Sequence, residues 1–302
     1  MKLVTYQRPG EPPRAGVLAG EEVIDAARAL ALERPLRDVG QLLCVAVDVL
    51  ERLRERLDAP GCRLPLAEGR LRAPILRPPT IRDFSAFETH VANAVANQGL
   101  DGPPPSWYRA PAFYFSNPLT VLDPESVVKR PAASSQLDYE LEVAMVIGRE
   151  GSDVPASRWR EWVAGFTLFN DFSARELCVA EYGALGIHKG KDFAQGLGPW
   201  LLTCDELEDR IFDDRLDLSV RARVNGETWS ESTTRDMHWG IGELLAYASR
   251  DSVVAPGDVI GFGTVGNGCV FEHPAEHRWL ADADVVELEG ERLGILRHTV
   301  RT

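Results

Sequence analysis

The stretch Leu137-Asp-Tyr-Glu140-Leu-Glu142-Val-Ala-Met-Val-Ile-Gly148 is the most informative part of this chain of 302 residues. Its side chains alternate with a period of two, which predicts one β-strand with every second residue from Leu137 to Ile147 on one face. The opposite face begins acidic and ends apolar, with Asp138, Glu140, Glu142, Ala144 and Val146 in that order. We therefore expect the strand to run from a polar site into a core that covers both of its faces.

Two glutamates at the polar end of this face, Glu140 and Glu142, have Cα atoms roughly 6–7 Å apart in an extended strand. Two carboxylates at the edge of a buried face are costly unless a cation compensates them. An ordinary solvated strand face can carry the same E-x-E pattern. The apolar continuation of this face favours a site for a hard metal ion.

The composition is that of a chain able to bury one large core, because 44% of its residues are hydrophobic. The formal net charge of -13 argues against nucleic acid or an anionic membrane as the main partner. No apolar run approaches transmembrane length, and the first residues read as a strand rather than as a signal peptide. The cysteines are scattered without a C-x-x-C pair, which is typical of reduced thiols in a cytoplasmic protein: Cys44, Cys62, Cys178, Cys204 and Cys269.

Two units are expected along the chain, a small N-terminal α/β domain at residues 1–71 and a larger domain at residues 72–302. The first unit should hold a helix over Val45–Leu57 and short strands at Leu3–Tyr6, Ala15–Leu18 and Glu22–Asp25.

In the larger unit, short strands separated by turn signals dominate. Asn225-Gly226 fits the turn of a type I′ hairpin, and helices are expected over Phe87–Asn97 and Gly240–Ser249. Few helices and no strand–helix alternation argue against a Rossmann or TIM-barrel architecture. The predicted fold class is α+β, with predominantly mixed β structure.

Four carboxylates stand in contexts that suit a cleft. Besides Glu140 and Glu142, Asp171 ends an apolar stretch that reads as a strand, and Asp83 lies where a strand should give way to a helix. Carboxylate oxygens of this kind suit Mg²⁺, Ca²⁺ or Mn²⁺. The residues alone do not decide whether the four lie together in space.

Three further residues are ambiguous by themselves. His90 lies seven residues after Asp83, about two helical turns along, but a lone histidine is more often a surface or core residue than a base. Glu272 follows a glycine-rich loop and either orients a histidine or caps the loop. Lys191 is one of two neighbouring lysines, with Lys189 beside it.

Taken together, ordered blocks of the sequence resemble the fumarylacetoacetate hydrolase family. The blocks are Asp83-x6-His90, Asp138-Tyr-Glu140-Leu-Glu142, Asn170-Asp171-Phe-Ser-Ala-Arg175-Glu, Pro256-Gly-Asp…Gly263-Thr264, Phe113-Tyr114-Phe-Ser-Asn-Pro and Lys191-x7-Pro199-Trp200. The resemblance covers about residues 72–290, and the N-terminal unit is similar to the small leading domain of many members.

The resemblance implies a β-roll catalytic domain, usually assembled as a homodimer, with a divalent cation such as Mg²⁺ in its cleft. As metal ligands it implies Asp83, Glu140, Glu142 and Asp171. His90 would match the base that activates water, and Glu272 the carboxylate that orients it. Arg175 and Lys191 would match the cations around the developing oxyanion. The implied substrate contacts are Tyr114, Tyr182, Thr264 and the position of Cys178.

Two departures from the family pattern bear on the substrate. Cys178 stands where fumarylacetoacetases carry a glutamine, and a thiol is a weaker donor than an amide. Ser85 replaces a tyrosine that lines the same pocket. Both changes favour a relative that acts on another acyl group. A nucleophilic Cys178 is disfavoured, because no histidine is evidently paired with it.

The hypothesis that follows is a metal-dependent hydrolase that cleaves a C–C bond in a β-diketo acid, either an acylpyruvate or a fumarylacetoacetate-like compound. One alternative is a decarboxylase, hydratase or isomerase of a 2-oxo acid such as oxaloacetate. Another is a metal-binding protein without turnover. In the first two cases the partner is a small-molecule diketo or oxo acid.

Overall fold

The computed structural model describes residues 1–97, 99–182, 184 and 186–302. Its framework is a central sheet of twelve strands. These are β1 (Lys2–Gln7), β2 (Arg14–Ala19), β3 (Glu22–Asp25), β4 (Arg63–Pro65), β5 (Arg70–Arg72), β6 (Ile81–Phe84), β7 (Phe113–Ser116), β8 (Val121–Leu122), β11 (Leu141–Ile147), β13 (Val163–Asp171), β15 (Gln195–Thr203) and β21 (Val259–Gly261). The order across the sheet is β4-β3-β2-β1-β15-β13-β11-β21-β6-β7, with β5 beside β1 and β8 beside β15.

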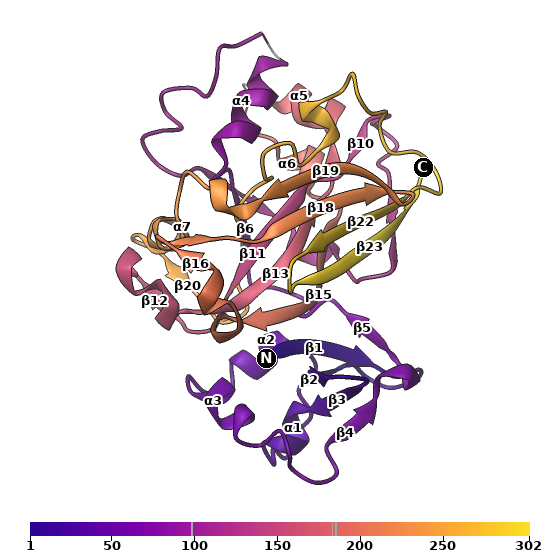
Figure 1. Ribbon diagram of the computed structural model, residues 1–302, viewed down its shortest axis with the longest axis vertical. Helices are drawn as coiled ribbons and strands as arrows, with labels where there is room; N and C mark the ends of the chain where they lie inside the picture. The colour runs from indigo at the N-terminus through magenta and orange to yellow at the C-terminus, as the bar shows by residue number, and fades with distance from the viewer. Residues whose placement is uncertain (98, 183, 185) are drawn as a thin grey trace.

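A second sheet of five strands packs on the central one (Figure 1). It consists of β9 (Ser126–Lys129), β18 (Ser219–Val224), β19 (Glu227–Thr233), β22 (Val285–Gly290) and β23 (Gly294–Arg301). The main hydrophobic core lies between the two sheets, where Val143 and Met145 of β11 join Leu288 and Leu296 of the second sheet. The fold is therefore the mixed, sheet-rich α+β fold that the sequence predicts.

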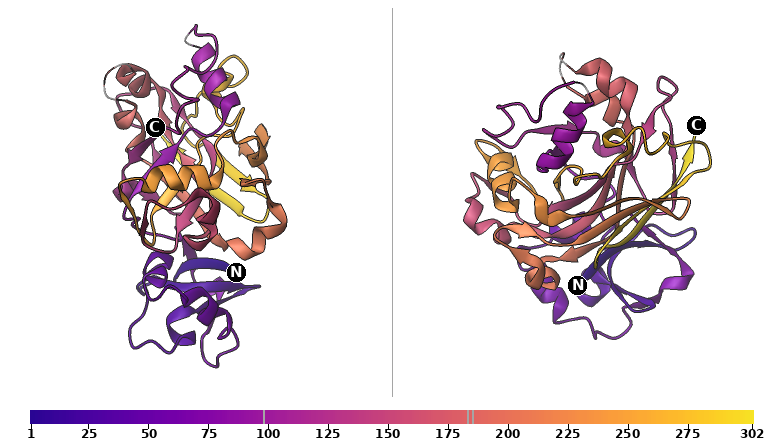
Figure 2. Two further views of the ribbon diagram at one scale, coloured as in Figure 1. Left: turned by 90° about the vertical axis from the view of Figure 1, so that its left-hand side faces the viewer. Right: turned by 45° about the horizontal axis from the view of Figure 1, so that its top comes forward.

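Among the described residues, seven α-helices lie outside these sheets: α1 (Ala26–Ala29), α2 (Val39–Leu43), α3 (Val49–Arg54), α4 (Glu88–Ala96), α5 (Arg175–Glu181), α6 (His188–Lys191) and α7 (Ile241–Ser249). Short two-stranded pairs complete the β structure: β10 (Leu137–Asp138) with β14 (Ser173–Ala174), β12 (Gly151–Ser152) with β20 (Val253–Val254), and β16 (Ile211–Phe212) with β17 (Arg215–Leu216). Helices α4, α5 and α6 gather at the end of the molecule away from the N-terminal strands (Figures 1 and 2). Within the described residues, no helix is long and apolar enough to cross a membrane.

The stretch that alternates with period two is interrupted, so its prediction as one continuous strand is wrong. Its first two residues form β10, which pairs with β14, and regular pairing resumes only in β11. The break falls at Tyr139 and Glu140, where the Glu140 N–H donates to the side-chain oxygen of Asn170 of β13, at 3.1 Å, instead of to a backbone carbonyl. Because of this break, Glu140 lies just before the first paired residue of β11, at the end of the central sheet.

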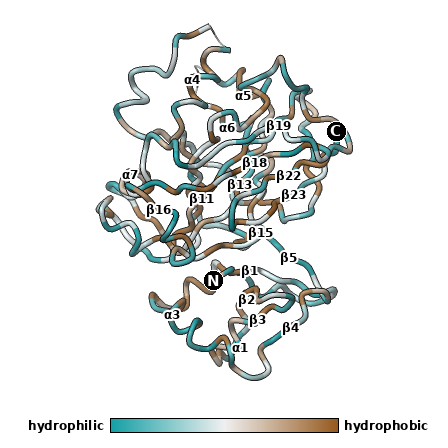
Figure 3. The backbone as a smooth tube through the Cα atoms, in the orientation of Figure 1, coloured by the Kyte–Doolittle hydropathy of each residue, from teal (hydrophilic) through white to brown (hydrophobic). Residues whose placement is uncertain are grey.

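The predicted two-sided burial of β11 is confirmed. Leu141, Val143 and Met145 enter the core between the sheets, whereas Ala144 and Val146 enter a second core shared with the N-terminal segment. In Figure 3, hydrophobic segments of the chain run through the interior along this strand. Because both faces are buried, the register of β11 is fixed and so is the direction of Glu142.

The N-terminal strands extend the central sheet. β1 pairs antiparallel with β15, with Leu3 opposite Leu201, so backbone hydrogen bonds link residues 1–71 to the rest of the chain. The predicted strands of this region appear as β1, β2 and β3. The division at residues 71 and 72 stays a prediction.

The predicted helix over Val45–Leu57 is wrong in extent. In this range the helix is the shorter α3, and Val45 lies before it, in the turn where its N–H closes the end of α2 on the carbonyl of Leu42. The other local predictions hold. α4 and α7 match their predicted ranges to within one residue at each end. Asn225 and Gly226 both have positive φ, 53° and 82°, as a type I′ turn requires.

One buried histidine couples the packing of the two sheets to pH. His298 of β23 meets the ring of Phe172 edge to face, with 5.4 Å between ring centroids, and lies against Gly196 of β15. Burial lowers the pKa of His298 from 6.5 to about 4. The ring is therefore neutral in the folded protein at neutral pH.

We expect the free energy of unfolding to decrease as the pH falls from about 6.5 to about 4, because the unfolded chain takes up a proton at His298 in this window and the folded chain does not. The variant His298→Leu removes this titration and should flatten the dependence. Urea unfolding of both proteins at pH 7, 6 and 5 measures the difference. An identical pH dependence in the two proteins would contradict a neutral, buried His298.

Candidate functional site

Four carboxylates meet at one end of the central sheet. β6 supplies Asp83, β11 supplies Glu142, β13 ends at Asp171, and the break before β11 supplies Glu140. All four are buried, with exposures of 3% or less. Each offers an oxygen, and these four atoms lie within 4.8 Å of one another. The structure thus brings together the four residues predicted as metal ligands.

Three oxygens of this cluster are buried without a hydrogen-bond partner: Asp83 Oδ1, Glu142 Oε2 and Asp171 Oδ1. Burial, with repulsion between the carboxylates, raises the pKa of Asp83 and of Glu142 well above their ordinary values. Buried carboxylate oxygens that lack a donor are the ligands that hard divalent cations take. The residues therefore fit Mg²⁺, Mn²⁺ or Ca²⁺.

Two buried cations compensate part of this negative charge. Lys191 of α6 donates to Glu140, and its Nζ lies 2.6 Å from Asp171 Oδ2. Arg175, the first residue of α5, places Nη1 at 2.8 Å from Glu140 Oε1. Although burial opposes ionisation, Lys191 and Arg175 hold the pKa of Glu140 below its ordinary value. Conversely, Asp171 and Glu140 outweigh burial and hold the pKa of Lys191 well above its ordinary value, so it stays charged.

The predicted base and its partner are in contact. His90 lies on α4, Glu272 ends the short 3₁₀ helix η6 (Val270–Glu272), and His90 Nδ1 is 2.9 Å from Glu272 Oε1. Glu272 also accepts hydrogen bonds from the Asn93 side chain at 2.9 Å and from the backbone N–H groups of Asn267 and Gly268 at 2.8 and 2.9 Å. Burial opposes the charge on Glu272, but His90 and these donors hold its pKa below the ordinary value. Because Nδ1 is committed to Glu272, Nε2 is the nitrogen left to exchange a proton.

A cavity of about 390 Å³ lies beside the carboxylate cluster and His90. The predicted site residues that line it are Asp83, Glu140, Glu142, His90, Arg175, Lys191, Tyr114, Tyr182 and Thr264. The Tyr114 hydroxyl donates to Asp171, and Thr264 Oγ1 donates to Glu142 Oε1 at 3.2 Å.

Cys178 is not among the described residues that line this cavity. It is buried, and its thiol packs against Gly190 of α6. Burial raises the pKa of the Cys178 thiol to about 11. A thiol with so high a pKa is a poor nucleophile at neutral pH, which agrees with the sequence-based argument against that role. Its predicted contact with substrate stays a prediction.

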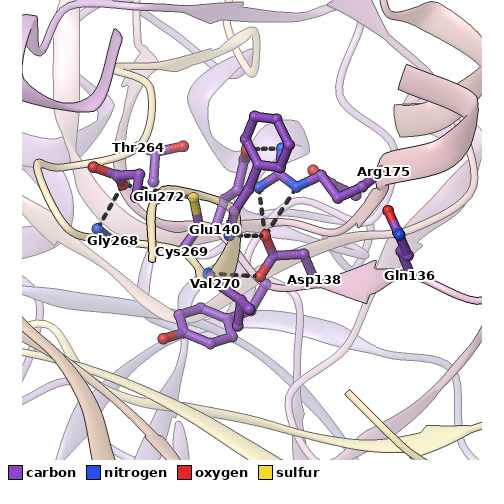
Figure 4. A network of polar contacts seen from close by, with 12 residues as sticks. Gln136, Asp138, Glu140, Arg175, Thr264, Gly268, Cys269, Val270 and Glu272 are labelled. Carbon is purple, nitrogen blue, oxygen red and sulfur yellow. Dashed lines mark hydrogen bonds and ion pairs between the residues drawn. The ribbon is translucent and has the colours of Figure 1, made fainter. Parts of the chain in front are cut away.

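Sequence reasoning assigned no role to Asp138, which the structure places at the centre of a polar network (Figure 4). Its carboxylate accepts the backbone N–H groups of Val270 and Phe271, each at 2.9 Å, and lies 2.7 Å from Arg175 Nη2. One buried carboxylate thus holds Arg175 on one side and the η6 segment that carries Glu272 on the other. Asp138 lies on the acidic face of the stretch Leu137–Gly148. The period of two in that stretch does not distinguish a residue that binds a metal ion from one that holds its neighbours in place.

Gly261 of β21 was also missed. It pairs with Ala144 of β11 on one side and with Asp83 of β6 on the other. A Cβ added here would overlap Asp83 Oδ1 and lie 3.3 Å from Glu142 Oε2. The absence of a side chain at this position makes room for the carboxylate cluster. The only signal in the sequence was a glycine at the end of an apolar strand.

Comparisons with known proteins agree with this geometry. The sequence model described as "Fumarylacetoacetate (FAA) hydrolase C-terminal" matches residues 80–301, which contain all the predicted site residues. The mitochondrial oxaloacetate tautomerase fahd2 of Xenopus laevis is 28% identical over 305 residues, covering 99% of this chain and 90% of that protein. The fumarylacetoacetate hydrolase domain-containing protein 2 homolog of Dictyostelium discoideum is 27% identical over 313 residues, covering 100% of this chain and 97% of that protein.

Among solved structures, the fumarylacetoacetate hydrolase of the psychrophilic Exiguobacterium antarcticum is similar over 100% of this chain and 99% of its own, with a TM-score of 0.75 and 25% identity. The family match over residues 80–301 places the chain in a class of enzymes that act on small molecules. Within that class, it belongs to the fumarylacetoacetate hydrolase family.

The space at Gly261 gives a direct test of the cluster. We expect Gly261→Ala to weaken Mg²⁺ binding roughly 10–100-fold, the range for changes that disturb the surroundings of metal ligands, because the added methyl group displaces the Asp83 carboxylate. Calorimetric titration with Mg²⁺ and the Mg²⁺-dependent rise in melting temperature measure the effect. Gly40→Ala adds the same methyl group on α2 and serves as the control. Unchanged Mg²⁺ affinity in Gly261→Ala would contradict the proposed ligand set.

The Asp138 network predicts a large effect on stability. Replacing Asp138 by Asn removes one charge of a buried ion pair with Arg175, and we expect the free energy of unfolding to fall by about 3 kcal/mol. Denaturant unfolding measures this change. Asp209→Asn breaks an exposed pair with Arg292 and should have little effect. Equal, small effects of both substitutions would show that Asp138 does not hold the network.

Proposed function

We propose that this protein is a divalent-metal-dependent hydrolase that cleaves a C–C bond in a β-diketo acid, either an acylpyruvate or a fumarylacetoacetate-like compound. The observation that carries the proposal is the contact between His90, which lines the cavity, and Glu272. Asp83, Glu140 and Glu142 of the carboxylate cluster line the same cavity. Metal-dependent enolisation alone needs an ion and a proton acceptor. A fixed histidine–carboxylate pair next to the cluster is the arrangement that activates water.

The proposed ligands are Asp83, Glu140, Glu142 and Asp171, with Mg²⁺ as the first ion to test. When bound, such an ion polarises the carbonyl oxygens of the substrate as a Lewis acid. The remaining chemistry belongs to side chains. His90, oriented by Glu272, takes a proton from water at Nε2 while the water oxygen bonds to the carbonyl carbon. Lys191 and Arg175 stabilise the oxyanion that develops there, and losing one such donor typically costs ~3–4 kcal/mol.

The bond between that carbon and the neighbouring methylene then breaks, and its electron pair passes to the methylene carbon as an enolate. The proton held by His90 returns to this carbon. The products are a carboxylic acid and a ketone or keto acid, so that one water is consumed and no redox partner is needed. By family resemblance, we propose a homodimeric assembly and a cytoplasmic location.

A second candidate is the tautomerisation, decarboxylation or hydration of a 2-oxo acid such as oxaloacetate. It is favoured by the similarity to a relative named as an oxaloacetate tautomerase. Tautomerisation and decarboxylation require the metal and an enolate, but they do not require the activated water that the His90–Glu272 pair would supply.

His90→Ala distinguishes the two candidates. We expect it to lower kcat for acylpyruvate cleavage roughly 10²–10⁴-fold, the usual contribution of a general base, and to leave Mg²⁺-induced thermal stabilisation in place. Loss of enol absorbance in the presence of Mg²⁺ or Mn²⁺, with a panel of acylpyruvates beside oxaloacetate, measures turnover. His277→Ala, which removes a histidine stacked on Trp229, should keep full activity.

Full hydrolase activity in His90→Ala would refute the assignment of the base. Consumption of oxaloacetate alone would favour the second candidate. A rise in melting temperature with Mg²⁺, without consumption of any diketo or oxo acid, would favour a metal-binding protein without turnover.

A further inference from the structure

The cationic groups of the cavity are already engaged at its polar end. Among the described residues that line the cavity, Arg175 and Lys191 are the only arginine and lysine, and both pair with buried carboxylates. The carboxylates outnumber these two cations, so the polar end keeps an excess of negative charge. A bound divalent ion would offset that excess at the cluster itself. No further cation on the described lining is placed to receive a second carboxylate.

Much of the remaining lining of the cavity is apolar. Val91, Ala94 and Val95 have the i, i+3, i+4 spacing that puts them on one face of α4, and all three line the cavity. No described residue of α4 is buried by the core. The apolar face of α4 is therefore covered by no part of the core, although the same helix carries His90.

Two aromatic residues of the lining are held in place by their own contacts. Trp107 lines the cavity, is 6% exposed, and donates its indole N–H to the carbonyl of Ser85 at 2.9 Å. Its ring also contacts those of Tyr108 and His238, with centroids 4.9 and 4.8 Å apart. Phe113 also lines the cavity and packs against Phe84 at 4.9 Å between centroids. We call Val91, Ala94, Val95, Trp107 and Phe113 the apolar subsite.

We propose that the apolar subsite receives the acyl chain of the substrate, and that this chain is apolar and carries no carboxylate at its far end. The inference rests on the proposed function, which places the diketo acid head at the carboxylate cluster. A methylene buried here gains free energy by leaving water. A terminal carboxylate would lose its hydration without a cation to pair with.

The test measures binding without turnover. Straight-chain 2-oxo monoacids and 2-oxo diacids of five or more carbons, matched in length, are titrated calorimetrically into the Mg²⁺-loaded protein. These compounds lack the second carbonyl of a diketo acid and the β-carboxylate of oxaloacetate, so neither cleavage nor decarboxylation is expected. We expect the monoacid Kd to fall roughly three- to fourfold per added methylene until the subsite is filled. Each diacid should bind at least about tenfold more weakly than the monoacid of equal length.

A cation introduced into the subsite should reverse this preference. Val95→Lys is expected to bind the diacids more tightly than the matched monoacids. Ala92→Lys places the same charge on α4 at a position that is not among the described lining residues, and it should keep the preference for monoacids.

The outcomes separate this inference from the proposed function. Diacids that bind as tightly as monoacids, or a Kd independent of chain length, would overturn the apolar subsite even if acylpyruvates are hydrolysed. A preserved monoacid preference without cleavage of any diketo acid would overturn the hydrolase and leave the subsite standing. Failure of every 2-oxo acid to bind would overturn the subsite together with the head-group position on which it depends.

Discussion

The repulsion among four buried carboxylates is the constraint on which the rest of the site depends. Asp83, Glu140, Glu142 and Asp171 are almost fully removed from water at one end of the central sheet, where burying an uncompensated carboxylate costs several kcal/mol. Lys191 and Arg175 offset only part of this charge. The oxygens left without donors are where we propose that a divalent ion supplies additional positive charge.

The cations that compensate the cluster also connect it to the proposed base. Arg175 bridges Glu140 and Asp138, and Asp138 holds the backbone of η6, which ends at Glu272. Glu272 in turn orients His90 on α4. A chain of charged or charge-assisted contacts therefore connects the cluster to the proposed base. The apolar face of α4 lines the same cavity.

How much of this the sequence could predict depends on the range of the interaction. The alternation in β11 predicted its burial on both faces, because a period of two is a local property. The break before β11 could not be predicted, because the Asn170 side chain that accepts the Glu140 N–H lies thirty residues away. The grouping of the four carboxylates and the pairing of His90 with Glu272 were predicted from the family resemblance. The supporting roles of Asp138 and Gly261 arise from neighbours on other strands, and a single sequence carries no signal for such contacts.

Anomalous diffraction from crystals grown with Mn²⁺ is the most direct test of whether the carboxylate cluster binds a divalent ion. We expect one strong anomalous peak at the end of the central sheet. It should lie within coordinating distance of the Asp83, Glu142 and Asp171 carboxylates, with Glu140 as the fourth ligand. The absence of a peak at this cluster, at a saturating concentration of Mn²⁺, would show that the four carboxylates do not bind the ion. In that case Lys191 and Arg175 alone would compensate the buried charge, and the proposed reaction would lack the Lewis acid that polarises the substrate carbonyl.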